Sequence, residues 1–231
     1  MVVLSFALFL LLLSSFPSLR SQWFAKLCNM LSKPGPLDDW RCGVASKARG
    51  NVLELGSGPG TNFRCYDDAV ISSFTGIEPN SYFSEDLQRN KELNNLTFPV
   101  NHRWLKGEDL DVDAGTFDFA VGTHVPCSVE SVSSVLWNVD VALKDGGTYA
   151  FMEHVSAERG SWLRFAQELV SPVFTIVAND CRFRDVGEEI QEELVVGRGY
   201  ECEIEKFDGP VPLVPSVPHI RRTCVKGKKG R

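Results

Sequence analysis

The sequence predicts an α/β fold in which a seven-stranded, mostly parallel sheet of the Rossmann-like type is flanked by helices. Three observations lead to this prediction. From residue 51 onward, apolar strand-like runs alternate with helix-like segments, which is the order found in parallel sheets. The first run ends in a glycine-rich turn, as in folds that bind nucleotides. The chain has 231 residues, enough for a large domain with an ordinary buried core.

The strands are expected where short apolar runs are bounded by turn residues. The parallel strands should lie at residues 51–56, 72–78, 100–105, 117–123 and 148–155. Two further runs, at 200–207 and 219–226, are expected to form a final hairpin pair.

Two helices can be placed with some precision. Before the fifth strand, apolar residues recur at three- and four-residue steps, which predicts an amphipathic helix facing the sheet: Val129, Val132, Leu136, Val139 and Leu143. Another helix is expected over 161–170, ended by Pro172. Large apolar side chains in and after this helix are expected to pack in a core rather than line a pocket: Trp162, Phe165, Val173 and Phe174.

Residues 1–33 predict a hydrophobic membrane anchor or signal segment. Residues 2 to 19 carry no charge, and positive charges follow this run, beginning at Arg20. By the positive-inside rule, these charges place the domain behind a retained anchor in the cytosol. A cleaved signal peptide, and hence secretion, is the alternative. Residues 34–50, which begin with Pro34-Gly35-Pro36, are interpreted as a linker, and residues 51–231 as the main domain.

Composition bounds the binding partners and the compartment. The formal net charge of −6 gives no electrostatic case for nucleic acid, which requires a clustered basic surface. The 7 cysteines are scattered and never spaced as Cys-x-x-Cys, and the 4 histidines show no metal-ligand spacing. These patterns argue against a disulfide framework and against a metal site, and they favour a reducing compartment. Asn95 begins a glycosylation sequon that can report on which side of a membrane the domain lies.

The most informative feature is the glycine-rich turn Gly56-Ser57-Gly58-Pro59-Gly60 after the first strand. Glycines there let the backbone turn tightly and let a ligand approach main-chain N–H groups at a helix N-terminus. Glu78, which ends the second strand, is placed to accept hydrogen bonds from both hydroxyls of a ribose. Glu54 would repel a pyrophosphate but suits a ligand that carries an ammonium and a sulfonium. An adenosine-containing cofactor is therefore expected.

The run from Val52 to Gly60 resembles the first motif of class I S-adenosylmethionine-dependent methyltransferases. With this resemblance, Glu54 and the turn Gly56-Ser57-Gly58 are expected to hold the methionine half of the cofactor. Pro79 would stiffen the turn behind the ribose-binding Glu78.

Two further turns should complete the cofactor pocket, because the carboxyl ends of parallel strands meet at the same edge of a sheet. The turn Lys106-Gly107-Glu108-Asp109 follows the third strand and would meet the adenine, with either Glu108 or Asp109 accepting from its exocyclic amine. Gly122 and Thr123 end the fourth strand and would lie beside the methyl group.

His124 is the candidate catalytic residue. Its imidazole could act as a general base, because the pKa of histidine lies near neutral pH. The alternative is a packed or hydrogen-bonded imidazole that only supports its neighbours, and the same two interpretations apply to Glu153-His154. Cys127 is expected to be a small buried residue, because methyl transfer from a sulfonium requires no nucleophile from the enzyme.

Further motifs resemble the small membrane-anchored thiol S-methyltransferases: Gly-Ile-Glu-Pro-Asn (76–80), Gly-Glu-Asp (107–109), Cys-Ser-Val (127–129), Phe-Met-Glu-His-Val (151–155), Asp-Cys (180–181) and Pro-His-Ile (218–220). The resemblance implies S-adenosylmethionine as cofactor and a small lipophilic thiol as methyl acceptor. It also implies attachment through the N-terminus to endoplasmic reticulum or lipid droplets, with the catalytic domain facing the cytosol. Two alternatives stay open: O- or N-methylation of a lipid or other small molecule, and a catalytically weak cofactor-binding protein on a membrane.

Overall fold

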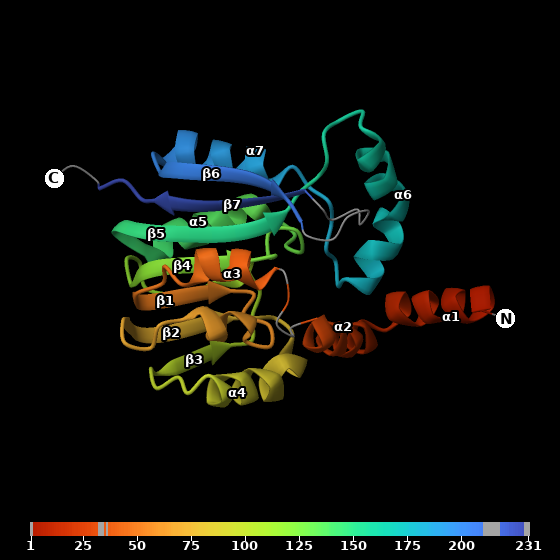
Figure 1. Cartoon of the computed structure of the whole chain (residues 1–231), viewed down its shortest axis with the longest axis horizontal. Coiled ribbons are helices and arrows are strands. Elements are labelled where there is room, and N and C mark those ends of the chain that lie inside the picture. The colour runs from red at the N-terminus through yellow and green to blue at the C-terminus, as the bar shows by residue number, and fades with distance from the viewer. Residues whose placement is uncertain (1, 32–34, 36, 210–217, 229–231) are drawn as a thin grey trace.

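Seven strands form one sheet in the order β3-β2-β1-β4-β5-β7-β6 (Figure 1). The computed structural model describes residues 2–31, 35, 37–209 and 218–228. Pairing is parallel from β3 through β5, whereas β7 is antiparallel to both β5 and β6. The strands are β1 (Gly50–Leu55), β2 (Ile71–Ile77), β3 (Val100–Arg103), β4 (Phe117–Thr123), β5 (Leu143–His154), β6 (Glu201–Asp208) and β7 (Pro218–Val225). The predicted fold class and all seven predicted strands are confirmed, although β5 begins earlier than expected.

Helices precede and separate these strands. The α-helices are α1 (Val2–Ser15), α2 (Pro17–Leu31), α3 (Asp38–Ala45), α4 (Ser84–Leu93), α5 (Val132–Ala142), α6 (Trp162–Val177) and α7 (Val186–Ile190). Short 3-10 turns form η1 (Thr61–Cys65), η2 (Ser81–Phe83) and η3 (Gly107–Asp109), and a π-helical segment, η4 (Gln191–Val196), follows α7.

The two faces of the sheet carry separate cores, because alternate residues of a strand point to opposite sides. In β1, Leu53 packs with α5, α7 and η4, whereas Val52 packs with α3, η1 and α4. The predicted amphipathic helix is confirmed as α5, whose buried face includes Leu136 and Val139. The carboxyl ends of the parallel strands are thereby fixed toward the side where α2 and α6 lie (Figure 1).

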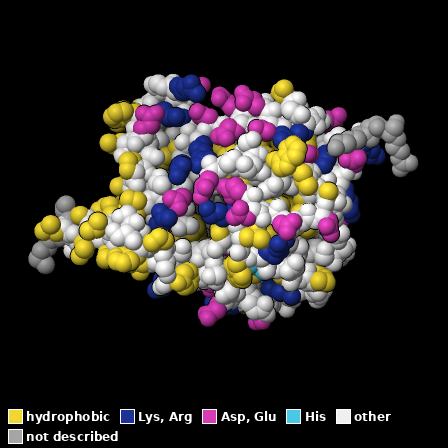
Figure 2. Space-filling model, turned by 180° about the vertical axis from the view of Figure 1, so that it is seen from behind, with side chains coloured by type: hydrophobic (Ala, Val, Ile, Leu, Met, Phe, Trp, Pro, Cys, Tyr) yellow, Lys and Arg dark blue, Asp and Glu magenta, His cyan; other side chains and the backbone are white. Residues whose placement is uncertain are grey.

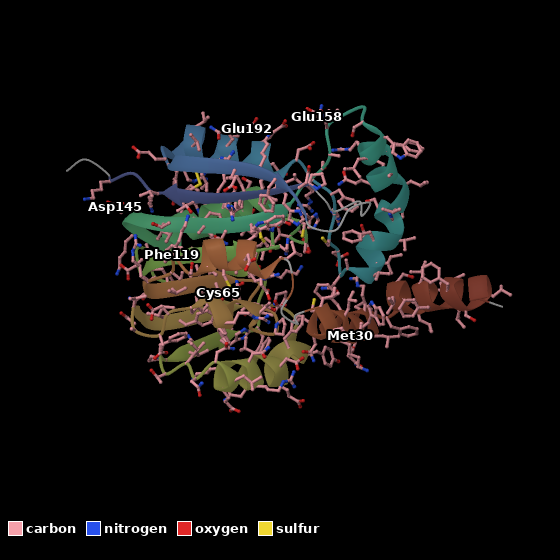
Figure 3. All side chains as sticks on the ribbon, viewed as in Figure 1. Met30, Cys65, Phe119, Asp145, Glu158 and Glu192 are labelled. Atoms are coloured by element: carbon pink, nitrogen blue, oxygen red, sulfur yellow. A yellow bond between two sulfur atoms is a disulfide. The ribbon has the colours of Figure 1, made fainter. Side chains whose placement is uncertain are left out.

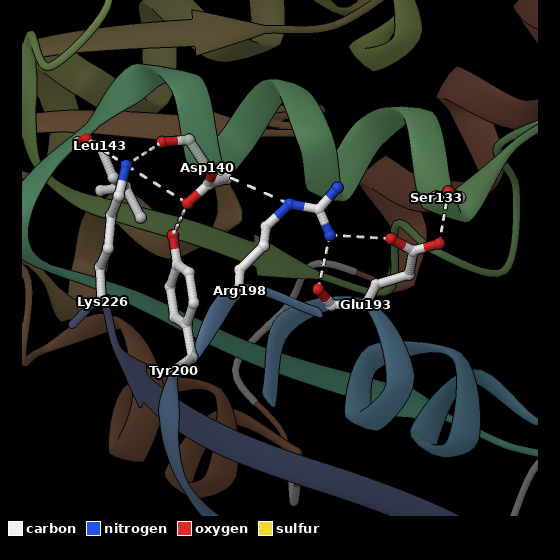
Figure 4. A network of polar contacts seen from close by, with 7 residues as sticks. All are labelled: Ser133, Asp140, Leu143, Glu193, Arg198, Tyr200 and Lys226. Carbon is white, nitrogen blue, oxygen red and sulfur yellow. Dashed lines mark hydrogen bonds and ion pairs between the residues drawn. The ribbon is translucent and has the colours of Figure 1, made fainter. Parts of the chain in front are cut away.

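A polar network joins the outer side of α5 to the last two strands (Figure 4). The carboxylate of Asp140 accepts from the hydroxyl of Tyr200 at 2.9 Å and pairs with Nζ of Lys226 at 3.2 Å. Arg198 pairs with Asp140 and with Glu193 of η4. The network lies on the α5 side of the sheet, and none of its side chains lines the cavity described below.

The expected linker is in part a helix. Pro34 and Pro36 lie outside the described residues, but α3 follows directly and packs against the sheet, where Val44 and Ala45 are buried. Its Asp38 accepts from Arg64 at 2.9 Å. The prediction of a linker over 34–50 is therefore wrong for Asp38–Ala45, because apolar residues on one face of this short helix find a core to bury them.

Pro172 does not end α6, which continues to Val177. Proline in a helix interior costs about 3 kcal/mol through its missing N–H and its clash with the preceding turn. Packing beyond it favours the helix: the ring of Phe174 stacks on Phe183 at a centroid distance of 4.7 Å. The expected core packing is also wrong for Trp162, Phe165 and Val173, which are exposed.

Four of the cysteines form disulfides, contrary to the expectation from their spacing (Figure 3). Cys42 of α3 is bonded to Cys65 of η1. Cys202 and Cys224 face each other in the register of β6 and β7 and are bonded as well. In both disulfides the two cysteines are some twenty residues apart in sequence and become neighbours only in the folded protein. A search for close Cys-x-x-Cys spacing does not detect such pairs.

Residues 2–31 form two helices that meet at a bend. Among the described residues, no single helix has both the length and the apolar character to cross a membrane. Leu4–Ser15 and Pro17–Leu31 satisfy both criteria only as a pair, and they are bent by 113°.

Candidate active site

A cavity of about 610 Å³ opens over the carboxyl ends of β1, β2 and β4. Most of the predicted site residues line it: Glu54, Gly56, Ser57, Gly58, Glu78, Pro79, Gly107, Glu108, Thr123 and His124. Three predicted residues do not line it, namely Gly60, Asp109 and Gly122. The structure thus brings the glycine-rich turn, the second-strand acid and His124 to one enclosed space.

The glycine-rich turn adopts backbone angles that side chains rarely tolerate. Gly56, Gly58 and Gly60 have φ of 60°, 49° and 78°. A Cβ on Gly56 would lie 2.5 Å from a methyl carbon of Val125, so glycine also permits close approach to the β4 loop. A Cβ on Gly60 would meet Phe63, which shows that Gly60 shapes the turn rather than contacting a ligand.

Glu78 is held at the cavity wall by main-chain donors. Its two carboxylate oxygens accept from the N–H of Gly58 at 3.1 Å and of Asn80 at 2.9 Å. Burial raises the pKa of Glu78 to about 7, against the lowering effect of these hydrogen bonds. The carboxylate retains acceptor capacity, since each oxygen has two lone pairs. Its position at the end of β2 fits the predicted contact with ribose hydroxyls.

Glu54 lies at the cavity floor within a buried polar group that the sequence did not predict. Its carboxylate accepts from the hydroxyl of Tyr66 and from Nδ2 of Asn62, the latter at 2.8 Å. Burial raises the pKa of Glu54 to about 7. The guanidinium of Arg41 donates to Thr123 Oγ1 at 2.8 Å beside this group. An acid and a guanidinium in one place can hold the ammonium and the carboxylate of an amino acid, respectively.

The turn after β3 has a structural function as well as a place on the cavity wall. Oε1 of Glu108 accepts from the N–H of Glu130 at 2.7 Å and of Ser131 at 3.3 Å, which fixes the start of α5. Asp109 points elsewhere, so of the two candidates only Glu108 is at the cavity. Gly122 is absent from the wall because it pairs with Leu55 and Phe151 inside the sheet.

His124 has a left-handed backbone, with φ of 59°, and its N–H donates to Met152 O at 2.8 Å. Its ring lies 5.8 Å from that of His154 and 5.4 Å from that of His219, between centroids. Desolvation lowers the pKa of His124 well below its usual value, with further contributions from Arg41 and the two histidines. The imidazole is therefore neutral at pH 7 and able to accept a proton, and its catalytic role stays a prediction.

The second N-terminal helix, α2, forms part of the cavity wall. The position of Arg20 after an apolar run does not indicate this function. Arg20 of α2 pairs with Asp180 at 2.9 Å, and both residues line the cavity. Asn80 Nδ2 donates to Ser21 O at 2.9 Å, and so ties α2 to the turn after Glu78. Part of the expected anchor therefore belongs to the wall of the site.

The family model described as Methyltransferase domain matches residues 37–184. The chain belongs to this methyltransferase family. Thiol S-methyltransferase TMT1B of Homo sapiens is 32% identical over 180 residues, which are 76% of this chain and 70% of that protein. Thiol S-methyltransferase TMT1A of Homo sapiens is 29% identical over 181 residues, with the same coverage of 76% and 70%.

Solved structures agree with the methyltransferase fold. The YcgJ protein of Bacillus has a TM-score of 0.64 at 12% identity, covering 83% of this chain and 100% of that one. A DhpI–SAH complex has a TM-score of 0.58 at 18% identity, covering 92% of this chain and 97% of that one. The predicted methyltransferase fold, the enzyme class and S-adenosylmethionine as cofactor are confirmed.

The residues present fit this cofactor. Glu78 offers acceptors to the ribose, the glycine turn allows close approach, and Glu54 and Arg41 carry charges opposite to those of a methionine group. These are the groups that would hold it.

Proposed function

We propose that this methyltransferase transfers a methyl group from S-adenosylmethionine to the sulfur of a small lipophilic thiol. The relatives named thiol S-methyltransferase support the acceptor class. The observation that carries the proposal is the position of the His124 imidazole on the wall of the cavity. An imidazole of lowered pKa is a weak base, and a thiol, with a pKa of about 8.5, is far easier to ionise than an alcohol.

The protein contributes position, exclusion of water and one proton acceptor. Bound S-adenosylmethionine supplies an electrophilic methyl group on a sulfonium. Glu78 and Gly58 would hold the ribose, and Glu54 with Arg41 would hold the amino-acid end of the cofactor. His124 would accept the proton of the thiol during methyl transfer, and the cofactor would leave as S-adenosylhomocysteine. Alignment of the two reactants in an enclosed cavity accounts for much of the rate.

The direct test is formation of S-adenosylhomocysteine by the full-length, detergent-solubilised protein. Small lipophilic thiols are offered in parallel with alcohols, phenols and amines of the same carbon skeleton. We expect product from the thiols only. Product from oxygen or nitrogen acceptors alone would replace the thiol with that acceptor class, and bound cofactor without turnover on any acceptor would contradict the enzymatic proposal.

We further propose that α1 and α6 attach the enzyme to a lipid surface. Exposed apolar side chains gather on the projecting N-terminal helix, seen on the left of Figure 2. In α6, Trp162, Phe165 and Leu169 are exposed at helical spacing on one face. Because α1 contacts α6, the apolar faces of the two helices are neighbours. The apolar face of α6 therefore continues the apolar surface of α1, which favours lipid as the molecule that covers it.

Flotation with phosphatidylcholine vesicles tests this attachment. The triple variant Trp162→Ser, Phe165→Ser, Leu169→Ser should float less well than the wild type. Trp137→Ser on α5 is the matched control, because Trp137 is also exposed but lies outside this face. Equal flotation of all three proteins would remove α6 from the proposal.

Glycosylation of Asn95 can report on which side of the membrane the catalytic domain lies. The charges after the apolar run favour the cytosolic face of endoplasmic reticulum or a lipid droplet, whereas two disulfides favour an oxidising compartment. Asn95 is exposed, so the sequon is accessible to glycosylation. A mass shift removed by a glycosidase, and absent in Asn95→Gln, would indicate the lumenal or secreted state; we propose the cytosolic state, in which no shift occurs.

A further inference from the structure

Two cysteines and a histidine from three separate elements meet beneath the wall of the cavity. Cys127 lies in the loop after β4, His154 ends β5, and Cys181 follows α6. One ligand atom from each residue lies within 4.8 Å of the other two. Their exposed fractions are 1%, 6% and 7%, so the three side chains form a buried sulfur–imidazole cluster.

The contacts within the cluster are those of a group of potential metal ligands. Nε2 of His154 lies 2.9 Å from Sγ of Cys181. Nδ1 of His154 is buried without a hydrogen-bond partner in the part of the chain that the structure describes. Buried polar atoms of native proteins nearly always have a partner, and the ring nitrogen in contact with a thiol is the other one, Nε2, so Nε2 is the atom placed to bind an ion.

A buried acid holds the main chain of two cluster residues in place. The side chain of Glu153 is fully buried, and its carboxylate accepts from the main-chain N–H of Cys127 at 3.3 Å and of His154 at 2.9 Å. One of its oxygens also lies 3.6 Å from Nε2 of His154. These hydrogen bonds fix the main chain at Cys127 and at His154, so one buried side chain positions two members of the cluster.

Cys127 and Cys181 are reduced, which distinguishes a metal site from a structural disulfide. The structure joins Cys42 to Cys65 and Cys202 to Cys224, yet Cys127 and Cys181 are free thiols although they are neighbours. Two thiols and an imidazole are soft and borderline ligands, which select zinc over magnesium or calcium.

We propose that Cys127, His154 and Cys181 are three ligands of a zinc ion. Three protein ligands leave the fourth position of a tetrahedral ion for a non-protein ligand such as water. Each thiol loses its proton on binding, so two thiolates neutralise the charge of the ion. The proposal does not depend on which acceptor the enzyme methylates.

The position of the site gives the ion a function in shaping the cavity. Ser128, next to Cys127, lines the cavity, as do Asp180 and Arg182 on either side of Cys181. The N–H of Arg182 already donates to Cys127 O at 3.0 Å. A shared ion would hold both wall segments to the end of β5, which makes the three ligands positioning residues.

Metal content of the purified full-length protein is the first test. We expect about one zinc ion per chain by mass spectrometry of the elements, as for a single mononuclear site. Cys127→Ser, Cys181→Ser and His154→Asn should each lose it, whereas Cys28→Ser should retain it. Cys28 is the matched control because it is the third cysteine outside the two disulfides and lies outside the cluster.

A second measurement on the wild type guards against variants that fail to fold. After zinc is removed with a chelator, cobalt(II) should bind at about one equivalent and give the near-ultraviolet absorption of cobalt–thiolate bonds. Magnesium should not compete with it. Failure to bind zinc or cobalt, or recovery of a Cys127–Cys181 disulfide in peptide maps of the unreduced protein, would overturn the site. Thiol methylation by protein that binds no metal would overturn it and leave the proposed function intact.

Discussion

The two halves of the cavity are built in different ways. The cofactor half is built around the glycine-rich turn and Glu78, joined by a main-chain hydrogen bond from Gly58, with Glu54 and Arg41 beside them. The acceptor half, where we expect the thiol, is lined by His124 after β4 and by Asp180 and Arg182 after α6. Behind it, three histidine rings lie within 6.4 Å of one another. Backbone geometry recognises a cofactor of fixed shape. Side chains on separate elements can be exchanged individually, so this half can determine the acceptor.

The largest expected effect is in the cofactor half. Glu78→Ala removes acceptors that we expect to take two charge-assisted hydrogen bonds from the ribose, each worth about 1.5–3 kcal/mol. The dissociation constant of S-adenosylmethionine should therefore rise on the order of 100-fold, as measured by calorimetry. Asp109→Ala is the control, since Asp109 does not line the cavity, and it should bind normally. Equal affinity of Glu78→Ala and wild type would remove Glu78 from the ribose site.

The pH dependence of cofactor binding should also arise in this half. The pKa values of Glu54 and Glu78 are raised to about 7, so both are largely neutral below that pH. A cationic ligand binds the ionised forms, and affinity should increase with pH toward about 7 and then level off. Below that value, the slope is roughly tenfold per pH unit for each acid that must ionise.

The same raised pKa values affect stability with the opposite sign. A carboxyl with a folded pKa above its unfolded value stabilises the ligand-free protein below about pH 4.5, and this contribution is lost as pH rises through about 7. Thermal unfolding without and with cofactor should separate the two effects. A flat affinity across this range, or the same slope in Glu54→Gln, would show that these acids do not titrate with binding.

A smaller effect is expected in the acceptor half. His124→Asn removes the proton acceptor, while asparagine tolerates the positive φ of this position. We expect kcat with a thiol to fall about tenfold at neutral pH, less than the roughly 10²–10⁴-fold typical of general acid–base catalysis, because thiols ionise readily. The deficit should shrink as the pH passes the pKa of the thiol. A deficit that stays constant across that range would indicate a packing role for His124.

The sequence predicts the cofactor half of the cavity better than it predicts the acceptor half. Strands and the cofactor turn are local patterns, so Gly56, Glu78 and the seven strands can be placed from the order of residues alone. The zinc ligands and disulfides cannot, because their partners are brought together only when distant segments pack. The sequence indicates only that Cys127 is small and buried, and it is buried, but its neighbours Cys181 and His154 lie far away in the sequence.

Tertiary packing also overrides two local rules. Pro172 marks a helix end in a sequence, but the stacking of Phe174 on Phe183 lets α6 continue through it. The Pro-Gly-Pro run favours a linker, but α3 begins at Asp38 and carries Arg41 into the cofactor half. Arg41 has no motif around it that would identify it.

The smallest effect is expected where α2 joins the two halves. Arg20 pairs with Asp180 across the cavity mouth, with 22% and 42% of their side chains exposed. A partly exposed ion pair is worth at most about 1 kcal/mol, so Arg20→Ala should speed cofactor release by no more than roughly fivefold. Stopped-flow release rates at low and high salt would measure this, because salt should reduce the difference between the proteins. The exchanged pair Arg20→Asp with Asp180→Arg should restore slow release if α2 is a closing element held by this pair. If the losses of the two single variants simply add in the double variant, the pair does not hold α2, and closure depends on the hydrogen bond from Asn80 to Ser21 and on apolar packing.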